Sequence, residues 1–78
     1  METGQIQELL QKAFPECEIT VEGGDGKYMI HAIGSMFEGL NAVKRQQAVY
    51  RVLNEHISSG AIHAVSMRLL TPNEQDAS

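Results

Sequence analysis

The chain has 78 residues, enough for one small domain, and its 42% hydrophobic residues include two Phe, two Tyr and no Trp, so an aliphatic core is expected. Six Lys and Arg against ten Asp and Glu give a net charge of −4, which provides no overall positive field to attract phosphate. The sequence contains neither an apolar run long enough for a membrane span nor the pattern of a signal peptide, so a cytoplasmic protein without membrane association is expected.

The N-terminal segment is predicted to form an amphipathic helix from about residue 4 to 14. Thr3 is a plausible N-cap, because its hydroxyl can accept a bond from a free backbone N–H group. Apolar residues then recur at helical spacing on one face: Ile6, Leu9, Leu10, Ala13 and Phe14. Pro15 disfavours helical geometry at Phe14, so the helix should end there.

The segment that follows is predicted to form two strands joined by a glycine-rich turn. Apolar and polar residues alternate over residues 17–22, which is typical of a half-buried strand with an acidic outer face. Gly23-Gly24-Asp25-Gly26 then offers residue types that accept the positive φ of a tight hairpin. The second strand, from about residue 27 to 33, is fairly apolar on both sides, as expected of a central strand. His31 is therefore expected in the middle of the core.

A long helix is predicted next, from about residue 42 to 58. The segment from Gly34 to Gly39 interrupts the strand pattern, and Asn41 is a plausible cap. Apolar side chains repeat at helical spacing along one side: Val49, Val52, Leu53 and Ile57, with Val43 and Tyr50 flanking them. Lys44, Arg45 and Arg51 are left on or near the outer surface.

A last strand is predicted between Gly60, which stops the helix, and Thr71-Pro72, where proline has no amide for the ladder. Alternation divides it into a core-facing set and an outward set: His63, Val65, Met67 and Leu69 in the first, and Ile62, Ala64, Ser66, Arg68 and Leu70 in the second. His63 is expected at the rim of the core with a ring nitrogen open to solvent. The polar residues 73–78 are expected to form a frayed tail, so the domain spans 1–72.

The element order is helix, strand, strand, helix, strand, which predicts an α/β two-layer sandwich with both helices on one face of a three-stranded mixed sheet. The hairpin makes the first two strands antiparallel, and the crossover through the long helix makes the second and third parallel. His63 should therefore lie beside the glycine turn, and Cys17 at the opposite end of the sheet. A strand of six residues is about 20 Å long, too far for these two side chains to share a metal.

Four segments together resemble the BolA family, in particular its short bacterial branch. They are Gly23-Gly24-Asp25-Gly26, Phe37-Glu38-Gly39, the helix entry from Val43 to Tyr50, and Ile62-His63-Ala64-Val65-Ser66 followed by Thr71-Pro72. Their order and spacing carry the resemblance over nearly the whole chain. It implies a fold similar to a class II KH domain, in agreement with the topology derived above.

The resemblance also implies a partner, a monothiol glutaredoxin, with which a 2Fe-2S cluster is shared. Thiolates from the glutaredoxin and from glutathione would ligate the cluster on one side, and His63 on the other, so the isolated protein would carry no cofactor. Gly24, Asp25, Gly26 and Lys27 would form the rim of this site. Family members often have a His or Cys in the hairpin, but Lys27 stands at the corresponding position here, which leaves a second ligand in doubt.

Other interpretations of the same residues stay open. Some relatives are treated as DNA-binding transcriptional regulators, and Lys44, Arg45 and Arg51 could contact phosphates or dock a protein partner. Three phosphate contacts give a salt slope of only about −2.7, which indicates weak binding. From the residues alone, a structural histidine held by a backbone carbonyl is the more common role for His63, and the resemblance favours a ligand; Cys17 is best explained as a core thiol. No catalytic constellation can be assembled near His63, so an enzyme is not expected.

Overall fold

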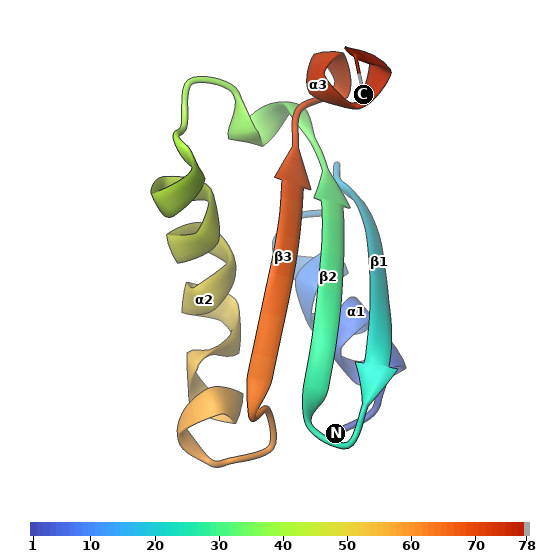
Figure 1. The fold of residues 1–78 in the computed structure, drawn as a ribbon, viewed down its shortest axis with the longest axis vertical. Coiled ribbons are helices and arrows are strands. Elements are labelled where there is room, and N and C mark those ends of the chain that lie inside the picture. The colour runs from blue at the N-terminus through green and yellow to red at the C-terminus, as the bar shows by residue number, and fades with distance from the viewer. Residues whose placement is uncertain (78) are drawn as a thin grey trace.

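The computed structural model of the chain describes residues 1–77 and has the predicted element order (Figure 1). The two long helices and three strands are α1 (Thr3–Ala13), β1 (Glu18–Gly24), β2 (Lys27–Ile33), α2 (Ala42–Ser58) and β3 (Ala64–Leu70). Two short helices were not predicted: the 3-10 helix η1 (Ser35–Phe37) and α3 (Pro72–Ala77). No helix within residues 1–77 is long and apolar enough to cross a membrane.

The sheet has the predicted mixed topology, with β2 in the centre. β1 is antiparallel to β2, with Gly24 opposite Lys27, and β3 is parallel to β2, with Lys27 opposite Ala64. In Figure 1, α1 passes behind β1 and β2 while α2 runs alongside β3. The first residues of β3 thus lie at the hairpin end of the sheet, as the crossover through α2 predicts.

The core lies between the sheet and the two long helices. Its buried side chains come from every one of these elements and from the loops: Ile6, Leu10, Cys17, Ile19, Val21, Tyr28, Ile30, Ala32, Phe37, Val49, Leu53, Ile62 and Leu69. The predicted inner face of α2 is confirmed at Val49 and Leu53, whereas Val43 is 60% exposed. Phe37 is fully buried although it lies in the segment that interrupts the strand pattern. Burial of such a side chain stabilises the fold by about 1.5–3 kcal/mol.

The hairpin between β1 and β2 is tighter than the four-residue turn predicted. Strand pairing continues up to Gly24 and Lys27, so only Asp25 and Gly26 form the turn. Their φ values of 55° and 81° are both positive, as a type I′ turn requires. Aspartate tolerates this conformation better than most side chains, and glycine adopts it without steric cost.

The ends of α1 differ from the prediction by about one residue, whereas α2 has the predicted bounds. Glu2, not Thr3, is the N-cap of α1, and its backbone N–H donates to Gln5 Oε1 at 2.7 Å. Phe14 is the residue after the helix, and its N–H donates to the carbonyl of Leu10 at 2.8 Å. The predicted Asn41 cap of α2 is confirmed, because its Oδ1 accepts from the Lys44 N–H at 2.9 Å.

Two predictions of burial along the strands are wrong. β3 begins at Ala64, so the alternation does not extend back through the preceding loop, and Ile62, predicted to face outward, is 2% exposed. Its N–H donates to the His56 carbonyl at 3.0 Å, which turns this side chain into the core. His31 is half-buried on the uncovered face of the sheet rather than in the core. The neighbouring positions of β2, Ile30 and Ala32, occupy the core face instead.

The expected frayed tail is also wrong where the structure describes it. Residues 72–77 form α3, and Ser78 lies outside the described residues. Thr71 is buried, its N–H donates to Glu74 Oε1 at 2.8 Å, and the Glu74 N–H donates to Thr71 Oγ1 at 3.2 Å. These reciprocal bonds satisfy free N–H groups at the start of α3, as in a capping box.

Candidate functional site

His63 lies in the loop between α2 and β3, directly before the strand begins. Its backbone N–H donates to the carbonyl of Gly26 at 2.7 Å, and the Ala64 N–H donates to the same oxygen at 3.0 Å. The shared acceptor joins the entrance of β3 to the tip of the hairpin. The predicted proximity of His63 to the glycine turn is therefore confirmed.

The side chain of His63 is exposed and lies against Gly26. Within residues 1–77, neither nitrogen of its ring has a hydrogen-bond partner. The carbonyl of Gly26 thus holds the main chain of His63, while the side chain stays exposed. A neutral imidazole in this state can use a lone pair to bind a metal.

Among the hairpin residues, Gly26 lies directly against this imidazole. Gly24, Asp25 and Lys27 are exposed, and Gly26 between them is buried beneath the His63 ring. The Lys27 ammonium has no lone pair when charged, so it cannot ligate a metal. Within residues 1–77, no group of three or more His, Cys, Asp or Glu side chains could hold a metal ion. A metal ion bound at His63 would therefore need further ligands from outside the described residues.

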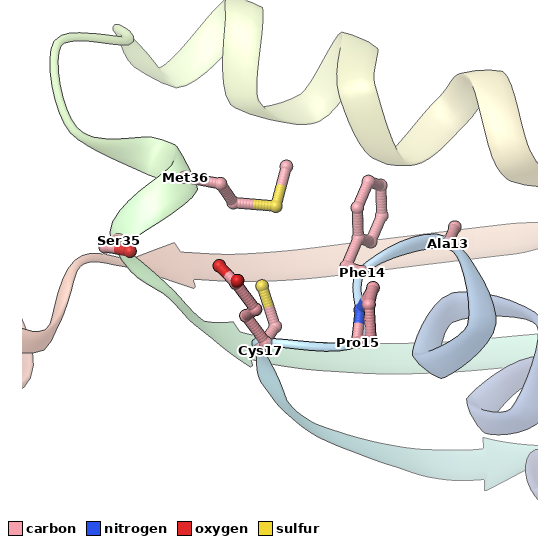
Figure 2. Close-up of a pocket in the computed structure, with 7 residues that line it drawn as sticks. Ala13, Phe14, Pro15, Cys17, Ser35 and Met36 are labelled. Atoms are coloured by element: carbon pink, nitrogen blue, oxygen red, sulfur yellow. The ribbon is translucent and has the colours of Figure 1, made fainter.

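Cys17 lies at the opposite end of the sheet, as predicted. Its side chain is 5% exposed and, in Figure 2, lies among Phe14, Pro15 and Met36. These residues line a cavity of about 260 Å³. Burial raises the pKa of the Cys17 thiol, and the nearby Glu16 carboxylate raises it further. A protonated, buried thiol is a core residue rather than a ligand or nucleophile.

The predicted basic surface of α2 is smaller than expected. Lys44 and Arg51 are exposed, but the Arg45 side chain is only 13% exposed. Its guanidinium donates to the carbonyls of Leu40 at 2.9 Å and Leu69 at 3.0 Å, and to Glu74. Arg45, expected on or near the outer surface, is therefore largely covered and engaged by other elements.

Glu74 completes the arrangement around Arg45. Arg45 Nη1 lies 2.6 Å from Glu74 Oε1 and Nη2 lies 3.2 Å from Oε2, and the guanidinium lies 5.9 Å from the centre of the Phe37 ring. The hydrogen bond from Arg45, with that from the Thr71 backbone, lowers the pKa of Glu74 to about 2. Arg45 therefore joins α2, β3 and α3, which a reading of α2 alone does not reveal.

Comparison with known proteins shows the family of this chain. The profile of the BolA-like protein family matches residues 6–74, which is most of the chain. The chain belongs to the BolA-like family. The resemblance predicted from the hairpin, the helix entry and the His63 segment is confirmed.

Relatives and solved structures cover nearly all of this BolA-like protein. It is 45% identical to an uncharacterized protein of the rpoN-murA intergenic region of Acinetobacter guillouiae, over 95% of this chain and 89% of that protein. It is 40% identical to the acid stress protein IbaG of Escherichia coli K12, over 95% and 88%. A BolA homologue from Coxiella burnetii, 28% identical, superposes with a TM-score of 0.84 over 97% of each chain. BolA1 from Arabidopsis thaliana, 30% identical, superposes with a TM-score of 0.81 over 95% and 98%.

Proposed function

We propose that this BolA-like protein binds a monothiol glutaredoxin and shares a 2Fe-2S cluster with it and with glutathione, in cluster assembly, trafficking or iron sensing. The observation that carries the proposal is the exposed imidazole of His63, which has no hydrogen-bond partner within residues 1–77 and stands at the tip of the hairpin. His63 would supply the only nitrogen ligand from this chain, and the thiolates would come from the partner and glutathione.

The residues around His63 fit this role chemically. A neutral nitrogen that replaces a thiolate on one iron raises the reduction potential of such a cluster, as in Rieske centres. Gly24 and Asp25 are exposed in the hairpin whose Gly26 lies against the imidazole, so the partner can approach from the hairpin end. Lys27 would shape the rim without binding iron. The remote, buried Cys17 takes no part.

The test mixes this protein with a cluster-loaded monothiol glutaredoxin and records visible absorbance and circular dichroism. We expect a one-to-one complex with a changed spectrum. His63→Ala should abolish the change while the isolated protein unfolds at the same denaturant concentration, because an exposed side chain contributes little to the core. His31→Ala is the matched control, since this histidine lies on the sheet face away from the helices, and it should leave the spectrum unchanged.

Lys27→Ala provides a second comparison and should alter the spectrum far less than His63→Ala. A complex of His63→Ala with an unaltered spectrum, or unfolding of that variant, would make His63 a structural residue and refute the proposal.

The alternative function is DNA binding by a KH-like transcriptional regulator. The exposed cations Lys44 and Arg51 on α2 are the observation that supports it. With Arg45 engaged by Glu74, two cations remain, and two phosphate contacts correspond to a salt slope of only about −1.8. Gel-shift titrations of the wild type and of Lys44→Ala with Arg51→Ala, at two salt concentrations, test it. Tight, sequence-dependent binding that persists at physiological salt and requires these residues would favour the regulator over the cluster adaptor.

A further inference from the structure

Gly26 approaches the His63 ring more closely than any other residue type could. A β-carbon built on Gly26 would lie 2.3 Å from His63 Cδ2, 3.1 Å from Cγ and 3.4 Å from Nε2. Real β-carbons essentially never come within 3.0 Å of a heavy atom outside their own residue and its chain neighbours. The observed position of the ring is thus available only while residue 26 has no side chain.

The same contact sets the orientation of the imidazole. The three ring atoms nearest to the built β-carbon are Cδ2 and the two atoms bonded to it, so Nδ1 and Cε1 form the edge on the far side. The main chain is fixed as well, because the Gly26 carbonyl accepts from the N–H groups of both His63 and Ala64. One residue therefore holds the backbone of His63 and supports its ring.

We propose that Gly26 is the positioning residue for His63, an inference that rests on the proposed role of His63 as a cluster ligand. A side chain at position 26 would force the imidazole to rotate away and move both nitrogens from the place that the partner's iron must reach. Groups that orient a metal ligand typically change metal affinity by about 10- to 100-fold when they are altered. Gly26→Ala should therefore weaken the complex without removing the ligand.

The positive φ of Gly26 offers a different reason for a glycine, so the test needs a variant that isolates it. Gly39 has a φ of 77° against 81° for Gly26, and a β-carbon built on Gly39 would meet nothing within 4 Å. Gly39→Ala therefore introduces a similar backbone strain without a collision. Gly60, with a φ of 84° and equally open surroundings, gives a second control in the loop that leads to His63.

The first measurement uses the isolated protein and needs no cluster. We expect a nuclear Overhauser effect between the Gly26 α-protons and the His63 Hδ2 proton in the wild type. Gly39→Ala and Gly60→Ala should keep it, and Gly26→Ala should lose the equivalent effect and shift the His63 ring resonances while the sheet resonances persist. Absence of the effect in the wild type, or unmoved ring resonances in Gly26→Ala, would overturn the proposal.

The second measurement uses the complex with the cluster-loaded glutaredoxin. Gly26→Ala should weaken it by about 10- to 100-fold and Gly39→Ala by much less. In a His63→Ala background, Gly26→Ala should cause no further loss, because it acts only through the ring; an equal loss in both backgrounds would refute positioning. If the wild type shows the Gly26–His63 contact but forms no complex, the proposed function fails while the contact itself stands.

Discussion

The surroundings of Cys17 lower the reactivity of its thiol. The thiolate is the reactive form of cysteine, and burial together with Glu16 raises the pKa of this thiol above its ordinary value of 9.0. The native protein near neutral pH should therefore react with Ellman's reagent at least about tenfold more slowly than the guanidinium-unfolded chain. Stopped-flow absorbance measures both rates. Equal rates would mean that the Cys17 side of the core opens readily.

Arg45 is the residue whose role the structure changes most. Arg45→Ala would leave the carbonyls of Leu40 and Leu69 without this donor, and it would remove the partner of Glu74. Hydrogen bonds to charged groups contribute about 1.5–3 kcal/mol, so a loss of this size in the free energy of unfolding is expected. Urea denaturation measures it. Lys44→Ala, next in sequence but exposed, should change stability by less than about 0.5 kcal/mol.

The docking of helix α3 against α2 should depend on pH. The pKa of Glu74 is lowered from an ordinary 4.5 to about 2, mainly by the hydrogen bond from Arg45. A carboxylate with a lowered pKa in the folded state stabilises that state above its unfolded pKa, and the contribution is lost as pH falls from about 4.5 to about 2. We expect backbone amide resonances of residues 71–77 to shift in this window. Glu74→Gln should remove that dependence, and unchanged resonances in the wild type between pH 5 and 2 would contradict it.

The sequence contains the pattern of a helix start at α3. Thr71-Pro72-Asn73-Glu74 has a capping residue, proline at the first helical position and glutamate at the third, which together favour a helix start. The polar composition of the following residues suggested a frayed end instead. The capping box competes successfully because Glu74 also reaches Arg45 of α2, so the short helix gains a tertiary contact.

The whole molecule depends on a small core, so one large truncation should be severe. Leu53 is fully buried in the middle of α2, and Leu53→Ala should cost about 2–5 kcal/mol of unfolding free energy. A domain with a total stability of about 5–15 kcal/mol would lose a large part of it. The control is Val43→Ala on the same helix, which is 60% exposed and should be nearly neutral. Denaturation midpoints decide, and a neutral Leu53→Ala would place the core face of α2 elsewhere.

The order of the elements, the sheet topology and the ends at which Cys17 and His63 lie could all be predicted from the sequence. These features follow from local information: the period of apolar residues, the turn at Asp25-Gly26 and the rule that links a crossover helix to parallel strands. The position of His63 beside the hairpin therefore follows from the sequence alone.

Only the tertiary structure decided where several individual side chains point. Phe37 enters the core from a segment without period, and Ile62 turns inward because the His56 carbonyl holds its N–H before β3 begins. Arg45 finds its acceptors 24 and 29 residues along the chain, at Leu69 and Glu74. Periodicity reports on neighbours in sequence, whereas these positions are set by partners that only the folded chain brings together. The contact between Gly26 and the His63 ring is also set by the fold. The sequence shows a glycine at position 26 but not that a β-carbon there would collide with this ring.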